Sequence, residues 1–278
     1  MLREAREAIN FPVKSEEHVH EKHHHGHDAG ERLYIHGHSA IHQLPAHLKI
    51  LALLGFLLVV VTTPITHYWS YLGYFALIIS AILIAGLPLL TVFRRSLIEI
   101  PFLLFALLMP FFGTGESYEV AGFTLYREGI LAGAAIVAKG TLGVLGAITL
   151  SSTSTAREIL RGLERLHLPA LMVNIASFML RYLNVVTDEM ERMRIARASR
   201  GFEARGIRDW RILASVIATL FMRSYERGER VHLAMLSRGF TGVIPRTPEP
   251  PTSKSLYAKA FALPLFALIF SLAGRLLN

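Results

Sequence analysis

The heptapeptide ARASRGF at Ala196–Phe202 recurs as AMLSRGF at Ala234–Phe240, so that both copies fit the pattern A-x-x-S-R-G-F. Each copy closes a stretch in which apolar residues have helical spacing, and in each an arginine directly precedes a glycine. Arginine complements the negative end of a helix dipole, and glycine adopts the left-handed conformation that ends many helices. The repeat therefore predicts two long helices that end in the same way.

Three helices are expected between Ser151 and Lys254. Their predicted bounds are Ala156–His167, Ala170–Gly201 and Asp209–Arg238. Thr155 and Glu158 have the spacing of a capping box at the start of the first helix, and Pro169 prevents its continuation. The apolar core of the third, Ile212–Met222, is shorter than the roughly 20 residues that span a bilayer. We interpret the second and third as amphipathic helices that lie on or against a surface.

Long apolar runs dominate the rest of the chain. Its 278 residues are 52% hydrophobic with a positive mean hydropathy, and this composition indicates a polytopic membrane protein. Five spans are expected, at Leu48–Val61, Leu72–Val92, Leu97–Phe112, Gly129–Leu150 and Leu256–Leu277. The predicted fold class is all-α, with about five transmembrane helices and a cytoplasmic set of long amphipathic coupling helices between the fourth and fifth spans.

The expected spans divide the chain into four parts. These are a His-rich tail over 1–47, four transmembrane helices over 48–150, the helical region over 151–254 and a final transmembrane helix over 255–278, with a stiff linker at Thr247–Lys254. Basic residues gather on the cytoplasmic side of membrane proteins. Arg94 and Arg95 form a basic turn, and the helical region holds 17 of the 29 lysines and arginines. Both are therefore predicted to be cytoplasmic together with the N-terminus, while the loops at Thr66–Tyr71 and Gly113–Glu128 lie outside.

The N-terminal tail contains ten of the thirteen histidines. Clustered imidazoles bind transition metals readily, but a tract of this composition has no fixed geometry. We predict loose metal binding by His23, His24, His25 and His27, and no cofactor in a fixed site. The net charge of +8 is explained by membrane topology, so nucleic acid is not an expected partner.

Apart from basic residues near the ends of the first and fifth spans, the expected spans contain two clearly ionisable side chains, Glu99 and Lys139. Glu99 lies near the end of its span, from where its carboxylate can reach the interface. Lys139 is interpreted either as a functional group or as a structural partner of Glu99 or of backbone carbonyls. Gly129 and Gly133 have the spacing that lets two helices approach closely, in this chain or in a partner. Spans this apolar disfavour a self-sufficient carrier of metal ions, which needs ligands along its route.

The sequence lacks the motifs of two classes of enzyme. The chain contains no H-E-x-x-H or comparable ligand set of a metalloenzyme, and no P-loop for ATP.

Several further strings lie around the repeated motif, at His42–Lys49, Glu99–Phe102, Leu163–Pro169 and Arg181–Leu183. With four spans, two Arg-Gly motifs and a final span in this order, the chain resembles the T component of energy-coupling factor (ECF) transporters, most closely the CbiQ family of cobalt uptake systems. The resemblance implies a non-catalytic coupling subunit in a bacterial or archaeal plasma membrane. Its implied partners are two cytosolic ATP-binding subunits, a CbiM-like membrane subunit that binds the substrate, and membrane lipid.

The resemblance also implies roles for the repeated motif. Arg200 and Arg238 are expected to make charged contacts with the ATP-binding subunits. Four small residues are expected to shape the docking ends, namely Ser199, Gly201, Ser237 and Gly239. The family motif is usually written Ala-Arg-Gly, and serine replaces alanine here in both copies. Co²⁺ is the expected transported substrate; Ni²⁺ or a vitamin, or an autonomous His-rich metal carrier, are the alternatives.

Overall fold

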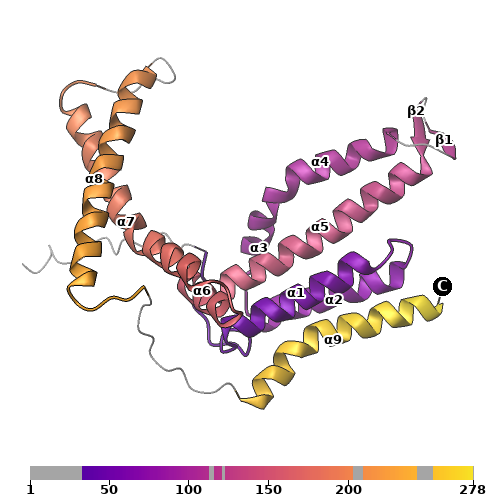
Figure 1. Cartoon of the computed structure of the whole chain (residues 1–278). Coiled ribbons are helices and arrows are strands. Elements are labelled where there is room, and N and C mark those ends of the chain that lie inside the picture. Colours follow the sequence, from indigo (N-terminus) through magenta and orange to yellow (C-terminus); the bar gives the residue numbers. More distant parts are fainter. Residues whose placement is uncertain (1–32, 113–115, 121–122, 203–208, 243–252, 278) are drawn as a thin grey trace, which may run out of the picture.

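The computed structural model describes residues 33–112, 116–120, 123–202, 209–242 and 253–277 (Figure 1). Helices make up nearly all of the described chain. They are α1 (Ala46–Thr62), α2 (Tyr68–Ile84), α3 (Leu89–Ser96), α4 (Ile100–Leu108), α5 (Arg127–Thr153), α6 (Ala156–Arg165), α7 (Ala170–Ala198), α8 (Trp210–Leu236) and α9 (Lys254–Leu277), with 3₁₀ turns at Leu97–Glu99 and Met109–Phe111. The all-α prediction is confirmed. The His-rich tail to residue 32 and most of the Thr247–Lys254 linker lie outside the described residues.

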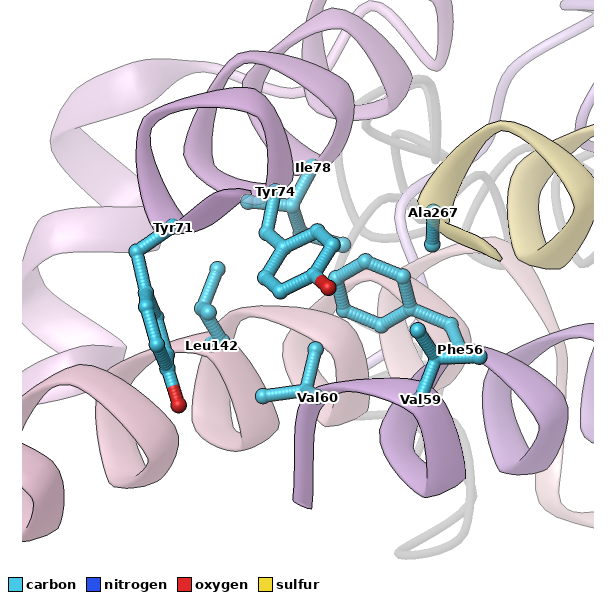
Figure 2. Close-up of a cluster of buried hydrophobic side chains, with 8 residues drawn as sticks. All are labelled: Phe56, Val59, Val60, Tyr71, Tyr74, Ile78, Leu142 and Ala267. Carbon is cyan, nitrogen blue, oxygen red and sulfur yellow. The ribbon is translucent and has the colours of Figure 1, made fainter. Parts of the chain in front are cut away.

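Four helices, α1, α2, α5 and α9, pack side by side into a bundle (Figure 1). Helix α9 lies against both α1 and α2, and α5 contacts the same two helices. Figure 2 shows the side chains at their centre, which are Phe56, Val59 and Val60 of α1, Tyr71, Tyr74 and Ile78 of α2, Leu142 of α5 and Ala267 of α9. Because lipid is as apolar as these side chains, close packing rather than escape from water holds such a bundle together.

Small residues and a buried hydrogen-bond network bring α9 close to its neighbours. The Cβ of a residue at position 73 would lie 2.6 Å from the ring of Phe270, so glycine is needed there. The Thr63 hydroxyl lies 2.9 Å from the Tyr74 hydroxyl and 3.2 Å from that of Ser271. Hydrogen bonds between helices supplement van der Waals packing inside a membrane. The network therefore ties the C-terminal half of α9 to both helices.

The close-packing pair Gly129 and Gly133 meets a neighbour within this chain. A Cβ at position 133 would lie 2.6 Å from the carbonyl oxygen of Ala106, and one at position 129 would collide with the backbone of Met109 and Pro110. Helix α5 therefore packs against α4 and the 3₁₀ turn that follows it. The close neighbour of Gly129 and Gly133 is therefore in this chain, a point that the sequence left open.

The structure assigns partners to the two charges that the sequence places within expected spans. Glu99 is only 4% exposed and accepts a hydrogen bond of 3.1 Å from the Thr141 hydroxyl, so the expectation that its carboxylate reaches the interface is wrong. The Lys139 ammonium donates to the carbonyl oxygen of Val61 at 2.8 Å, so of the two structural partners considered for it, Glu99 and a backbone carbonyl, it meets the carbonyl. Gly140 leaves room for the Glu99 carboxylate, because a Cβ there would lie 2.8 Å from its oxygen.

Two segments differ from the sequence prediction. The expected second span, Leu72–Val92, is not one helix: α2 ends at Ile84, Gly86 has φ 68°, and α3 starts after Pro88. The expected outer loop contains an antiparallel hairpin of β1 (Ser117–Val120) and β2 (Phe123–Tyr126). The α-helical part of the third span, α4, has nine residues.

Three of the described helices are long and apolar enough to cross a membrane, namely α5, α7 and α9. Helices α1 and α2 are apolar but have 17 residues each. Helix α7 is thus long and apolar enough to cross a membrane, although the sequence analysis assigns it to the cytoplasmic region. That domain assignment stays a prediction.

Candidate coupling-helix ends

The first copy of the repeated motif forms the end of α7, and we call residues 199–202 the first tip. The amide of Phe202 donates to the carbonyl of Arg197 at 3.1 Å, and the amide of Gly201 donates to that of Ala198 at 2.9 Å. These two bonds, with Gly201 at φ 73°, define a Schellman motif. The first tip therefore has a fixed backbone geometry that depends on glycine.

The second copy forms the same structure at the end of α8, and we call residues 237–240 the second tip. The amide of Phe240 donates to the carbonyl of Met235 at 3.0 Å, and the amide of Gly239 donates to that of Leu236 at 2.9 Å. Gly239 has φ 81°. The sequence repeat is thus a structural repeat, and the prediction that both helices end at a left-handed glycine is confirmed.

The serines of both tips hydrogen-bond to their own helices. The Ser199 hydroxyl donates to the carbonyl of Ala196 and the Ser237 hydroxyl to that of Ala234, each at 3.0 Å. The serine that replaces alanine in the family motif therefore adds one side-chain bond to the last turn of each helix.

Both tips present an exposed arginine. Within the part of the chain that the structure describes, neither Arg200 nor Arg238 forms an ion pair or a side-chain hydrogen bond. Arg194, two turns earlier on α7, differs: its guanidinium donates to both carboxylate oxygens of Glu191 at 2.8 and 2.7 Å. That hydrogen-bonded pair holds the pKa of Glu191 below its usual range. The tip arginines thus keep all their donors available for a partner.

Helices α7 and α8 run in opposite directions and cross near an ion pair between Glu189 and Arg223. The side-chain amide of Asn174, at the start of α7, donates to the carbonyl of Gly242, just beyond the second tip, at 3.2 Å. The tips therefore lie at opposite ends of the helix pair (Figure 1). At 1.5 Å per residue, they are about 18 and about 24 Å from the crossing.

The helix pair exposes many large apolar side chains. On α7 these include Leu171, Met172, Ile175, Met179 and Leu183, and on α8 Ile217, Phe221, Met222 and Tyr225. An apolar surface of this extent marks a contact with protein or membrane. Outside the two tips, the helix pair thus offers a second, chemically different surface.

Helix α6 connects the helix pair to the bundle. Thr155 and Glu158 form the predicted capping box at its start. Gly162 allows α6 to touch the start of α1, because a Cβ there would lie 2.8 Å from the amide nitrogen of His47. His167, two residues after the end of α6, has φ 65°, which is uncommon for a residue other than glycine. The turn into α7 is therefore tightly defined.

Two cations hold the end of α5, directly before α6. The buried ammonium of Lys49 donates to the Thr153 carbonyl at 2.7 Å and lies 2.9 Å from the Ser154 hydroxyl. The Arg95 guanidinium donates to the Ser152 hydroxyl at 2.5 Å and to the carbonyl of Leu33. Cations are favourable at the negative end of a helix dipole. The junction between bundle and helix pair is therefore pinned by charge-assisted hydrogen bonds.

The structure places the predicted site residues in two groups. Six belong to the tips: Ser199, Arg200 and Gly201 in the first, and Ser237, Arg238 and Gly239 in the second. The predicted metal-binding histidines, His23, His24, His25 and His27, lie outside the described residues. Among residues 33–112, 116–120, 123–202, 209–242 and 253–277, no cluster of three or more potential metal ligands occurs. The crossing pair was not predicted, because its two members are distant in sequence and resemble ordinary surface charges.

Comparison with known proteins places the chain in a family. The profile of the family described as CbiQ, cobalt transport protein, matches residues 37–249. Relatives include EcfT, an energy-coupling factor transporter transmembrane protein, from Staphylococcus aureus and from Listeria innocua. They are 27% and 28% identical over 230 and 232 residues, each covering 77% of this chain and 84% and 85% of the relative.

A third relative is archaeal. The uncharacterized protein MJ1089 of Methanocaldococcus jannaschii is 30% identical over 149 residues, 51% of this chain. The match spans little more than half of that relative, 56% of its length. The family match covers most of the present chain, from before α1 through α8, and includes both tips. The chain is therefore a membrane protein that belongs to the CbiQ cobalt transport protein family.

Proposed function

We propose that this chain is the transmembrane coupling subunit of an ATP-driven uptake transporter of the ECF type. The observation that carries the proposal is the pair of equivalent helix ends, each with an exposed arginine that forms no ion pair within the described residues. The family match and the similarity to the EcfT relatives, which are energy-coupling factor transporter transmembrane proteins, support it. Since the sequence has no P-loop, energy from ATP must come from other subunits.

In this proposal each tip docks into a groove of one of two cytosolic ATP-binding subunits. Guanidinium groups form strong, geometrically specific bonds with carboxylates, so Arg200 and Arg238 bind acidic groups there. The Schellman motif fixes the direction in which each arginine leaves its helix. Region 151–254 and the N-terminus are then cytoplasmic, as basic residues on that side favour.

The proposed movement starts when the ATP-binding subunits close. Closure displaces the two tips relative to each other, and the helix pair turns about the crossing at Glu189 and Arg223. Because α6 contacts α1 and follows the pinned end of α5, the turn is passed to the bundle. The exposed apolar face of α7 and α8 supports contact with a separate substrate-binding membrane subunit, which the movement tilts.

The proposed substrate of the complex is a transition metal, and the family description favours Co²⁺ over Ni²⁺. We place its binding site in the separate, CbiM-like subunit. The alternative, an autonomous metal carrier built around the histidine-rich tail, is tested by metal flux into proteoliposomes that contain this chain alone. Flux in that preparation would refute the coupling-subunit proposal.

The docking proposal is tested by co-purification in detergent with the subunits of its transporter. The variant combines Arg200→Glu and Arg238→Glu, which should abolish capture of the ATP-binding subunits and retain the substrate-binding subunit. The matched control combines Arg194→Glu and Arg230→Glu, two exposed arginines on the same helices but away from the tips. Equal capture by both variants, or equal loss, would contradict docking through the tips.

A further inference from the structure

A cavity of about 370 Å³ lies between α1, α2, α5 and α9, near the N-terminal end of α9. Its walls are mainly hydrocarbon, and they include Ala52, Ile78, Ala81, Gly146, Leu263 and Phe266. The exposed residues Ser80 and Ile84 of α2 form part of its edge. The cavity thus opens on the outer surface of the bundle, where a membrane protein meets lipid.

Pro264 accounts for the position of this cavity. At their far ends α2 and α9 are in close contact, with the Ser70 hydroxyl donating to the carbonyl of Phe270 at 2.9 Å. Proline inside α9 lacks the amide that would bond to the carbonyl of Ala260, and its ring bends the helix. Figure 1 shows the N-terminal part of α9 bending away from the line of its C-terminal half. The resulting divergence from α2 leaves the cavity.

The polar groups on the cavity wall already have partners. The hydroxyls of Ser80, Thr149 and Thr153 donate to carbonyls of their own helices at 2.7–2.8 Å. The ammonium of Lys49 donates to the Thr153 carbonyl. Water needs several polar partners in a buried site, so this wall suits hydrocarbon better. An unfilled cavity would leave its lining without dispersion contacts.

Lys259 is the exception among the lining residues. It is exposed, and within the described part of the chain it forms no hydrogen bond or ion pair. Among the residues that the structure describes, no aspartate or glutamate lines the cavity. Lys259 also directly precedes the apolar part of α9, which places its ammonium at headgroup depth while Phe266 lies about 10 Å deeper.

We propose that the cavity binds one phospholipid of the surrounding bilayer. One acyl chain lies between α2 and α9, and the Lys259 ammonium binds the phosphate of the headgroup. A lysine beside a phosphate favours lipids with net negative charge, because the ammonium of a zwitterionic headgroup repels it. The site therefore selects an anionic phospholipid such as phosphatidylglycerol over phosphatidylcholine with the same acyl chains.

Native mass spectrometry of the full chain in detergent tests this proposal, with each of these two lipids added in turn. We expect one tightly retained phosphatidylglycerol per chain. Lys259→Gln should weaken its binding about fivefold, the contribution of one lysine near a charged membrane surface, and should leave phosphatidylcholine unchanged. Lys254→Gln is the matched control, because Lys254 is exposed on the same helix but does not line the cavity.

A second variant tests the acyl-chain part of the site. Ala81→Leu fills the cavity and should reduce retention of both lipids, whereas Ala76→Leu, on an exposed part of α2 outside the cavity, should not. Should Ala81→Leu fail to fold, the comparison of Lys259→Gln with Lys254→Gln decides alone. Equal lipid selectivity in wild type and Lys259→Gln would overturn the proposal. Crosslinking of Ala81→Cys to a partner protein in the assembled complex would also overturn it, since a protein helix would then occupy the cavity.

Discussion

Alanine in place of Gly239 should weaken docking without removing any side-chain contact. A Cβ at this position would meet no atom within 4 Å, so the substitution causes no collision. The cost comes from φ 81°, because a left-handed conformation costs residues with a Cβ about 1–2 kcal/mol. Exposed helix ends open at little free-energy cost, so most of this penalty shifts the free second tip towards a frayed state. The apparent dissociation constant for an ATP-binding subunit should then rise by about 5- to 30-fold.

Three glycine variants provide controls for Gly239→Ala. Gly228 lies inside α8 with open space around its missing side chain, so Gly228→Ala should stabilise the helix by about 0.5–1 kcal/mol and leave docking intact. Gly86 has φ 68° and open space, so Gly86→Ala carries the same strain at the turn between α2 and α3, far from either tip. Gly239→Asn should recover much of the affinity, because asparagine tolerates the left-handed region.

The assay is binding of the purified ATP-binding subunits to the full chain in lipid nanodiscs, followed by biolayer interferometry. A lower affinity for Gly239→Ala alone, with near-normal values for Gly228→Ala, Gly86→Ala and Gly239→Asn, is the expected pattern. Wild-type affinity in Gly239→Ala would refute the argument that docking needs the Schellman geometry. Equal weakening by Gly86→Ala would show that the effect arises from general destabilisation.

Two further predictions concern the connection between the tips and the bundle. Lys49→Met should lower the thermal unfolding temperature of the purified chain, because the Thr153 carbonyl and Ser154 hydroxyl lose a charged donor. The loss should cost about 1–3 kcal/mol of folding free energy. Lys254→Met serves as the exposed control, and equal unfolding temperatures for the two variants would contradict this role of Lys49. Glu189→Arg should abolish ATP-coupled uptake by placing like charges at the crossing, and adding Arg223→Glu should restore part of it. No recovery in the double variant would show that coupling does not depend on this ion pair.

Local rules explain which parts of the fold were predictable from sequence. The ends of α6, α7 and α8 follow from a capping box, a proline and two glycines, and each lies within about three residues of the prediction. The break after α2 was missed because apolar residues continue through Leu89 and Leu90, and hydropathy does not register the turn at Gly86 and Pro88. The hairpin was missed because its strands are four residues long and lie in a segment with several acids.

In the candidate site too, features set by neighbouring residues were predictable from sequence, and contacts between distant residues were not. Gly201 and Gly239 could be assigned their conformation because a left-handed helix end is a property of a few consecutive residues. The burial of Glu99 depends on Thr141 and Gly140 in another helix, and the pairing of Glu189 with Arg223 depends on how two helices cross. Such contacts between distant residues have no local signature, so the pattern of charges alone suggested an exposed surface.

The antiparallel course of α7 and α8 offers a reason why the motif occurs twice. Two copies of one ATP-binding subunit associate most simply about a two-fold axis, which presents two equal grooves facing opposite ways. A chain with a single tip could engage one of them. Two antiparallel helices with equal ends are related by an approximate two-fold axis through their crossing. Under the proposed function, this local axis lies between the two ATP-binding subunits. Closure then changes the crossing angle at Glu189 and Arg223, so an intact crossing is as necessary for coupling as the tips themselves.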